Sequence, residues 1–439
     1  MVWRILLVLS LLSSLGHAAL KVMAIGDSLT REYEIMAVND GQGGTFPSPD
    51  SDPGNANTMN WVEILAEQRA SEVDFGHYSD DTGHEYNYAI PGSDSNQWMD
   101  IINASLLDAE FYLRLRMWED YNEVDVVVVM VGGNDVNFTY GELYDQLPGD
   151  ITPEDFKTNV INNLEDIIDE IRSINATVPI VLTDIPDPSP TPDIISDHPD
   201  ASKRAFVSNI VIELNQQVSA LATSRGLTFA RVSHLTDMLK ATDPFYIGAI
   251  EMIKDKDPTR ENRPLYLYCK EGLHPSTNGQ AILANILIDA INSATGSTTP
   301  NLPNRVILET LLGLNPDQPF IDWLAAKGIA QISMLLDSDG DGIPNLGEFL
   351  LGLEPLVADA VHVSTIQWFD GAANLTMTYK PDSNAARLAN ILIKQSTNLT
   401  DWSLIPEANI HLLPDGHKQV RLPMGHDGLY TRMEFELLP

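Results

Sequence analysis

The sequence contains every residue type that an acyl-transfer site needs, each placed just after an apolar run. A serine hydroxyl becomes a nucleophile when a neighbouring base removes its proton, and histidine is the commonest such base. An acid on the other ring nitrogen orients the histidine, and N–H groups stabilise the oxyanion that forms. The candidates are Ser28, His274 and Glu271 and, as oxyanion donors, Gly92 and Asn134.

Each candidate taken alone has an ordinary structural explanation. A serine at a strand end can be a helix N-cap, a glycine there serves a turn, and Asn134-Asp135 is common loop chemistry. Their shared placement is more informative, because ligands of open α/β sheets bind outside the carboxyl ends of the strands. We therefore expect one sheet edge to collect the polar ends of LKVMAIGDS, NYAIPG, VVVVMVGGND and LYLYCKEGLH.

The elements that must position these groups alternate along residues 20–295. The run DVVVVMV is too continuously apolar for a strand with one wet face, so helices should cover both faces. Alternation of strands and helices predicts a parallel α/β sheet. The expected strands are 20–25, 124–131, 180–182 and 227–232, and the expected helices are 59–69, 155–174, 205–224 and 278–292.

Local signals punctuate this pattern. Thr277 and Gln280 have the spacing of a capping box at the start of the helix that follows His274. Segments 38–58 and 186–193 are rich in Gly, Pro, Asp and Asn, which is typical of loops.

With these motifs in view, the chain resembles the SGNH (GDSL) hydrolase family. The four blocks of the family stand here as GDSLT at 26–30, NYAIPG at 87–92, GGND at 132–135 and EGLHP at 271–275. The resemblance covers about residues 20 to 295 and implies a three-layer α/β/α fold with a flavodoxin-like parallel sheet.

The resemblance also implies the roles of the site residues. Ser28 would be the nucleophile and His274 the general base, and the oxyanion would be held by the Ser28 amide, the Gly92 amide and the Asn134 side chain. Asp27 would be a structural turn residue.

The chain departs from the family at the acid, because the family has Asp three residues before the histidine and this chain has Glu271. A glutamate is one methylene longer, so the turn must adjust. A backbone carbonyl that orients His274 remains the alternative to Glu271.

Beyond residue 296 the chain changes character. ATGSTTPNLPN at 294–304 has linker composition, helical pieces follow at 306–314 and 320–326, and short alternating segments from about 360 predict a small antiparallel β domain. The expected divisions are a signal peptide over 1–18, a catalytic domain over 19–296, a linker and helical segment over 297–358 and a β domain over 359–439.

The segment DSDGDGIPNLGE has the ligand spacing of an EF-hand calcium loop, with oxygen side chains at positions 1, 3, 5, 9 and 12 and glycine at 6. A solvated acidic turn is the alternative. Pro344 differs from paired EF-hands, and the loop resembles those of dockerins and thrombospondin type 3 repeats. The predicted ligands are Asp337, Asp339, Asp341, the Ile343 carbonyl, Asn345 and Glu348.

Composition limits the partners. The formal charge of −36 opposes binding to nucleic acid. MVWRILLVLSLLSSLGHAA is typical of a secretory signal peptide, and no later segment is long and apolar enough to span a bilayer. Cys269 is the only cysteine, so an intramolecular disulfide is excluded and a buried thiol is expected.

These features predict a secreted serine esterase without a catalytic cofactor, acting on short acyl groups, above all acetyl, of a carbohydrate. Arylesterase, lipase-like or thioesterase activity is the alternative within the family. A protein of another class, a retired enzyme that binds glycan or a cell surface through the β domain, would fit the altered acid. Trp61, Trp98 and Trp118 could stack on sugar rings, although such aromatics are more often core residues.

Overall fold

The computed structural model describes residues 18–35, 58–259, 263–358, 365–369, 372–424 and 429–439. Most of the expected signal peptide over 1–18 and most of the expected loop over 38–58 lie outside these residues. The chain forms two compact units. The N-terminal unit is Met1–Ala241 with Asp255–Leu302, and the C-terminal unit is Thr242–Lys254 with Pro303–Pro439.

The N-terminal unit is built on a five-stranded parallel sheet in the order β2-β1-β5-β6-β7. β1 lies between β2 and β5; β2 pairs only with Leu20 and Lys21 at the amino end of β1, whereas β5 runs beside β1 as far as Gly26, two residues before Ser28. The strands are β1 (Leu20–Gly26), β2 (Val73–Asp74), β5 (Val126–Met130), β6 (Ile180–Thr183) and β7 (Thr228–Ala230). The parallel sheet predicted from the alternating pattern is confirmed.

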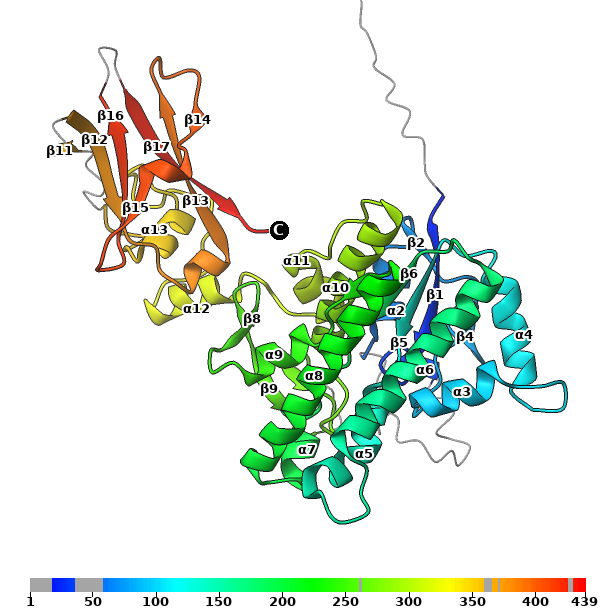
Figure 1. The fold of residues 1–439 in the computed structure, drawn as a ribbon. Helices are drawn as coiled ribbons and strands as arrows, with labels where there is room; N and C mark the ends of the chain where they lie inside the picture. The colour runs from blue at the N-terminus through cyan, green and yellow to red at the C-terminus, as the bar shows by residue number, and fades with distance from the viewer. Residues whose placement is uncertain (1–17, 36–57, 260–262, 359–364, 370–371, 425–428) are drawn as a thin grey trace, which may run out of the picture. The chain divides into compact units, whose positions relative to one another are not determined.

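Helices cover both faces of this sheet (Figure 1). Alternate strand residues such as Met23, Ile25, Val127 and Val129 pack into one core cluster with the helices α3, α5, α6 and α8. The helices α2 and α10 pack on each other and cover the other face. The helices are α2 (Trp61–Gln68), α3 (Ser95–Ile102), α4 (Phe111–Asp120), α5 (Gly133–Asp145), α6 (Pro153–Ile174), α7 (Pro192–Asp197), α8 (Ala201–Arg225), α9 (His234–Lys240) and α10 (Thr277–Thr295).

The predicted capping box at the start of α10 is wrong. Ser276 is the N-cap residue, and no side chain caps the helix. Gln280 instead accepts a hydrogen bond from the Trp61 backbone at 3.2 Å and donates one to the Tyr33 hydroxyl at 2.7 Å, while Thr277 accepts one from Met59 at 3.0 Å. These side chains tie α10 to the segments around α2, a use that local spacing does not reveal.

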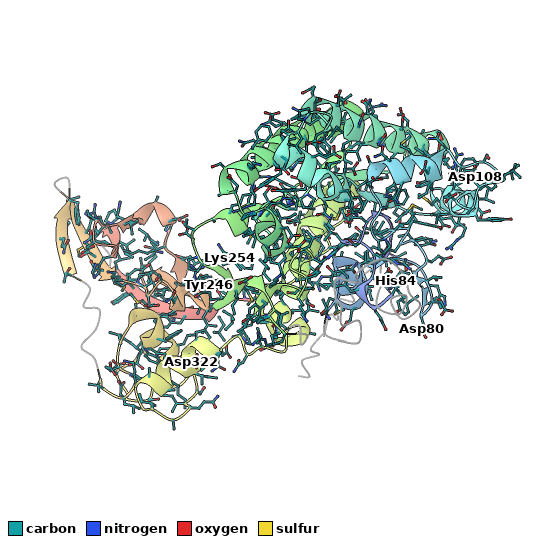
Figure 2. The ribbon with its side chains drawn as sticks, turned by 90° about the horizontal axis from the view of Figure 1, so that it is seen from below. Asp80, His84, Asp108, Tyr246, Lys254 and Asp322 are labelled. Atoms are coloured by element: carbon teal, nitrogen blue, oxygen red, sulfur yellow. The ribbon has the colours of Figure 1, made fainter. Side chains whose placement is uncertain are left out.

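Small antiparallel pieces complete the chain before residue 303. They are the pair β3 (Tyr78–Ser79) and β4 (Gly83–His84), and a sheet in the order β10-β9-β8, with β8 (Phe245–Ile247), β9 (Ile250–Lys256) and β10 (Tyr266–Tyr268). The β8–β9 hairpin, which carries Tyr246 and Lys254 (Figure 2), groups with the C-terminal unit. There the Arg387 guanidinium lies 3.9 Å from the centre of the Tyr246 ring.

The C-terminal unit contains two antiparallel sheets, in the orders β11-β12-β16-β15 and β14-β13-β17. Met377, Val420, Leu422 and Ile393, from strands of both sheets, form one core cluster. The strands are β11 (Thr365–Phe369), β12 (Ala372–Tyr379), β13 (Ala389–Ser396), β14 (Ser403–Leu404), β15 (Ile410–Leu412), β16 (Lys418–Pro423) and β17 (Tyr430–Leu437). The antiparallel β segments expected beyond residue 360 are therefore present.

Short helices precede these strands. They are α11 (Asn304–Val306), the π-helical turn η1 (Ile307–Leu311), α12 (Gln318–Ala326) and α13 (Asn345–Leu351), with 3₁₀ turns η2 (Ala385–Arg387) and η3 (Glu407–Asn409) further on. Phe320 of α12 and Phe349 and Leu350 of α13 pack against Leu388 in a second cluster of this unit. No helix in the described ranges is long and apolar enough to cross a bilayer.

A buried carboxyl group ties β6 to the turn after β7. Asp184 accepts hydrogen bonds from the Ser233 N–H at 2.8 Å and the Ser233 hydroxyl at 2.5 Å. Burial raises the pKa of Asp184 to about 6, above the ~3.9 of an exposed aspartate. The native state therefore holds this proton more tightly than the unfolded chain, and the contribution of Asp184 to stability falls as the pH rises from about 4 to about 6.

We expect Asp184→Asn to abolish this pH dependence. From pH 4 to pH 6 the free energy of unfolding of the wild type should fall relative to that of the variant, by on the order of 2–3 kcal/mol. Urea unfolding of both full chains at a series of pH values measures the difference. Asp166→Asn, at an exposed position of α6, is the control. A constant difference between wild type and Asp184→Asn would contradict the raised pKa.

Candidate active site

Ser28 lies in the turn that directly follows β1. The Asp27 carboxylate holds this turn by accepting a hydrogen bond from the Leu29 N–H at 2.9 Å. Asp27 is buried, and burial raises its pKa to about 6. Ser28 itself is only 9% exposed, so its hydroxyl faces the interior of the site.

His274 and Glu271 complete a hydrogen-bonded chain with Ser28. The Ser28 hydroxyl oxygen lies 2.7 Å from His274 Nε2, and His274 Nδ1 lies 2.7 Å from Glu271 Oε1. The Glu271 carboxylate folds back on its own turn, where it also accepts hydrogen bonds from the backbone N–H groups of Gly272 at 2.5 Å and His274 at 2.8 Å. The arrangement fits a nucleophile, a base and an orienting acid.

Backbone contacts fix the turn that carries the histidine. The Cys269 N–H donates to the His274 carbonyl at 3.0 Å, and the Tyr33 hydroxyl donates to the Pro275 carbonyl at 3.0 Å. The Tyr33 ring also meets the His274 ring edge to face, with 6.5 Å between the centroids. The Cys269 thiol is buried and forms no disulfide, as the sequence predicts.

The predicted oxyanion donors converge on the same edge. Asn134 opens α5 after β5, and its side-chain amide donates to the Ser93 carbonyl at 3.0 Å, which fixes the amide beside the segment of Gly92. The Ser93 hydroxyl in turn donates to the carbonyl of Gly26, at the end of β1, at 3.3 Å. In the described part of the chain, neither the Ser28 N–H nor the Gly92 N–H donates a hydrogen bond to the protein.

A further buried pair, which sequence reasoning did not find, braces this segment. Asp135 accepts hydrogen bonds from the Ser95 N–H at 2.8 Å and the Ser95 hydroxyl at 2.6 Å, and burial raises the pKa of the Asp135 carboxyl. Asp135 follows Asn134 directly, so the bond couples the start of α5 to the start of α3. In the sequence, the polar residues at the end of NYAIPGSDS indicate a hydrogen-bonding segment, but they do not indicate that Asp135 is its partner.

An open pocket adjoins the pair of Ser28 and His274, and its surface is mainly apolar. The predicted tryptophans do not contribute to it. Trp61 and Trp98 are fully buried, so the suggestion that they stack on sugars is wrong. The indole N–H of Trp118, on α4, donates to Glu170 at 2.7 Å, and the Arg114 guanidinium lies 4.6 Å from the centre of the Trp118 ring.

Comparison with known proteins identifies the family. The family model of GDSL-like lipases and acylhydrolases matches residues 22–287, more than half of the chain. The chain belongs to this family. Membership confirms the resemblance inferred from the four motif blocks, and with it a serine ester hydrolase on a flavodoxin-like sheet. No curated protein matches the chain.

Solved structures with a similar fold include other esterases, at low similarity. An acetylxylan esterase from Geobacillus stearothermophilus is 15% identical, with 63% of this chain and 95% of that chain covered and a TM-score of 0.32. A carbohydrate esterase of family 3 from Talaromyces cellulolyticus is 15% identical (64% and 100% covered, TM-score 0.33). An extracellular lipase from Streptomyces rimosus is 16% identical (63% and 100% covered, TM-score 0.37).

Outside the region that matches the GDSL-like family, the predicted calcium ligands lie before and within α13. Carboxylate oxygens of Asp337, Asp339 and Asp341 come within 4.8 Å of one another. Asn345 is fully buried, and its side-chain oxygen has no hydrogen-bond partner while its amide nitrogen donates to the Ser333 carbonyl at 2.7 Å. Glu348, the position-12 residue, is also fully buried.

The acid–base turn of this GDSL-like hydrolase depends on Gly272, the second residue of the EGLHP block. Gly272 has φ +87°, and a Cβ atom there would lie 2.9 Å from Lys256 Cδ and 3.0 Å from the Asp193 nitrogen. The Gly272 carbonyl accepts a hydrogen bond from that same Asp193 N–H at 3.1 Å. The start of α7 therefore abuts the turn between Glu271 and His274, and only glycine fits.

We expect Gly272→Ala to lower kcat on a small ester by about 10- to 100-fold, because a displacement of the base by a fraction of an ångström misaligns the attack. Steady-state kinetics with circular dichroism as a fold check measures the effect. Gly296→Ala is the matched control, since Gly296 has φ +76° and nothing within 4 Å of the added Cβ atom. Equal activity of the two variants would show that the Gly272 contact does not position the base.

Proposed function

We propose that this GDSL-like hydrolase is a secreted serine esterase that cleaves carboxylic esters through an acyl-enzyme on Ser28. The observation that carries the proposal is the continuous hydrogen-bonded chain of Ser28, His274 and Glu271, with 2.7 Å at each step. A hydroxyl, an imidazole and a carboxylate in this order are what nucleophilic acyl transfer requires. Because these hydrogen bonds between Ser28, His274 and Glu271 are intact, they argue against a retired enzyme that only binds glycan.

In the first half-reaction His274 Nε2 takes the Ser28 proton as the hydroxyl oxygen attacks the ester carbonyl carbon. The carbonyl oxygen becomes an oxyanion, which the Ser28 and Gly92 N–H groups and the Asn134 amide stabilise. The bond to the alcohol oxygen then breaks, and the alcohol leaves with the proton from His274. In the second half-reaction, water attacks the acyl-enzyme by the same steps, and the carboxylic acid product is released.

For the natural substrate we propose a short-acyl ester of a carbohydrate alcohol, above all an acetyl ester. Support comes from the sequence pattern of a signal peptide and from the β domain appended to the hydrolase. That β domain would contact glycan or a cell surface. Arylesterase, lipase-like and thioesterase activities remain the alternatives within the family.

We also propose that the loop over residues 337–348 holds one Ca²⁺ ion. The three clustered carboxylates offer hard oxygen ligands. The buried side-chain oxygen of Asn345 has no hydrogen-bond partner, and a bound cation would supply the missing interaction. The remaining ligands would be the Ile343 carbonyl and Glu348. An ion there would neutralise the crowded carboxylates and hold the loop on α13, so it would stabilise the C-terminal unit.

Replacement of the nucleophile tests the proposed function. We expect Ser28→Ala to remove nearly all hydrolysis of p-nitrophenyl acetate and of acetylated xylan, because no other group can form the acyl-enzyme. Residual catalysis from the oxyanion donors could remain ~10³-fold above water. The measurement is kcat on purified full-length protein with an unchanged melting temperature as control. Near wild-type turnover in the variant would disprove the role of Ser28.

Replacement of the acid distinguishes a triad from a dyad. We expect Glu271→Gln to lower kcat by up to about 10⁴-fold with little change in KM, because an amide cannot stabilise the imidazolium that forms in the transition state. Glu271→Asp should keep partial activity, since its carboxylate is one methylene short of His274. If kcat of both variants stays within a few-fold of the wild-type kcat from pH 5 to pH 9, the site is a Ser28–His274 dyad.

Removal of calcium tests the second proposal without recourse to activity. We expect EGTA to lower the melting temperature of the C-terminal unit by several degrees, since free calcium at about 100 times its Kd would contribute ~2.7 kcal/mol. Initial rates on a small ester should stay nearly unchanged. Asp339→Asn is the matched variant and should lose the response to EGTA. Calorimetry that detects no calcium binding to the full chain would reduce the loop to an acidic turn.

A further inference from the structure

The first two turns of α5 carry an amide and an aromatic ring on the side that meets the pocket. Asn134 and Asn137, three residues apart on this helix, both lie in the wall of the pocket beside Ser28. Phe138 comes four residues after Asn134 and does not belong to the wall. Residues three and four apart share one side of a helix. Asn137 and Phe138 therefore lie on the side of Asn134, one turn farther along α5.

Phe138 contributes little to the packing of the fold. Its side chain is 59% exposed. Among the described residues, its ring is absent from the core cluster of the N-terminal unit and contacts no other aromatic ring or cation. Tyr140 and Tyr144 of the same helix, by contrast, pack on each other and on His198. A single exposed apolar residue is ordinary on a protein surface, so its neighbours must show what the ring serves.

Asn137 supplies polar chemistry beside this ring. It is half-buried in the pocket wall, and its side-chain amide forms no hydrogen bond with the residues that the structure describes. Other polar groups of the wall are bonded within the protein. The Asp187 carboxylate accepts from Lys240 at 2.5 Å, and the Thr236 hydroxyl donates to the Ser233 carbonyl at 2.8 Å. The Asn137 amide, with two donor hydrogens and an acceptor oxygen, is therefore available to a ligand.

An exposed aromatic ring next to an unengaged amide has the chemistry that recognises a sugar. A pyranose has a face of C–H groups, and covering that face with a flat aromatic ring removes apolar surface from water. Its edge carries hydroxyl groups, which need hydrogen-bond partners once they leave water. A small aliphatic alcohol such as ethanol offers neither the flat face nor further hydroxyl groups.

We propose that Asn137 and Phe138 bind the alcohol half of the substrate, that this half is a pyranose, and that both residues determine specificity for it. The Phe138 ring covers one face of the sugar, and the Asn137 amide bonds to a hydroxyl group. Side chains on a helix lean toward its N-terminus, which in α5 is the end that carries Asn134, so the ring is directed toward the pocket. The inference rests on the proposed esterase function and adds the residues that select the alcohol.

The test compares Phe138→Ala with the wild type, as full-length proteins, on acetyl esters that differ only in the alcohol. The esters are acetylated methyl xyloside, acetylated methyl glucoside, p-nitrophenyl acetate and ethyl acetate. We expect kcat/KM on both sugar acetates to fall by about tenfold, mainly through KM, since roughly 50 Å² of lost apolar contact corresponds to that factor. On ethyl acetate, which makes no such contact, kcat/KM should change by less than about twofold.

Three further variants separate sugar binding from effects on the fold. Asn137→Ala removes one hydrogen bond to an uncharged group and should lower kcat/KM on the sugar acetates by about fivefold. Phe138→Tyr keeps a flat ring and should restore most of the activity on sugar acetates that Phe138→Ala loses. Tyr112→Ala is the matched control, because Tyr112 is 75% exposed on α4 and does not line the pocket. Its loss should change none of the four esters.

The outcomes separate this inference from the function on which it rests. An equal loss on all four esters in Phe138→Ala, with native melting behaviour, overturns the sugar site, and so does an unchanged profile. A loss confined to p-nitrophenyl acetate also overturns it and assigns the ring to an aryl alcohol. If the wild type cleaves ethyl acetate through Ser28 but neither sugar acetate, the sugar site is wrong and the esterase proposal stands. Failure of the wild type to cleave any of the four esters overturns both proposals.

Discussion

The site depends on one hydrogen bond, between Ser28 and His274, which joins residues 246 positions apart in the chain. It can form only if the carboxyl end of β1 and the turn before α10 meet at the same edge of the sheet. Other long-range bonds hold that meeting in place. Tyr33, five residues after Ser28, donates to the Pro275 carbonyl and accepts from Gln280. The nucleophile and the base are thus bound to each other by the structure around them as well as by their own contact.

The parts of this arrangement that sequence predicts are those encoded by local pattern. Val126–Met130 forms a fully buried strand because five consecutive apolar residues can be covered on both faces. The polar groups at strand ends were visible because parallel strands deliver their carboxyl ends to one edge. The family resemblance then assigned roles to Ser28, Asn134 and His274, which the geometry brings together. Of the four expected strand ends, those before Ser28 and Asn134 belong to the parallel sheet, whereas His274 follows β10 of a separate sheet and Gly92 follows a segment that forms no strand of the parallel sheet.

The parts that sequence did not predict are contacts between distant segments. Thr277 and Gln280 have capping-box spacing, yet their side chains bond to Met59, Trp61 and Tyr33 because those partners arrive from another part of the fold. The pocket combines motif residues such as Ser28, Asn134 and His274 with residues of β10, α9 and α10 that belong to no motif. The hairpin at Thr242–Lys254 groups with residues after 303, although it lies within the sequence of the hydrolase. Local propensity contains no information on such pairings.

The glutamate at position 271 shows how a departure from a motif is absorbed. Its longer side chain curls back, so that one carboxylate oxygen serves both the His274 ring and the His274 backbone N–H, while the other accepts from Gly272. This compact loop requires the left-handed conformation at Gly272, with φ +87°. The acid is therefore held by the same four-residue turn that carries the base. Acid and base therefore belong to one rigid turn, and the geometry of the site depends on how this turn is positioned relative to Ser28. The contacts of Tyr33 with Pro275 and of Asp193 with Gly272 hold the turn in that position.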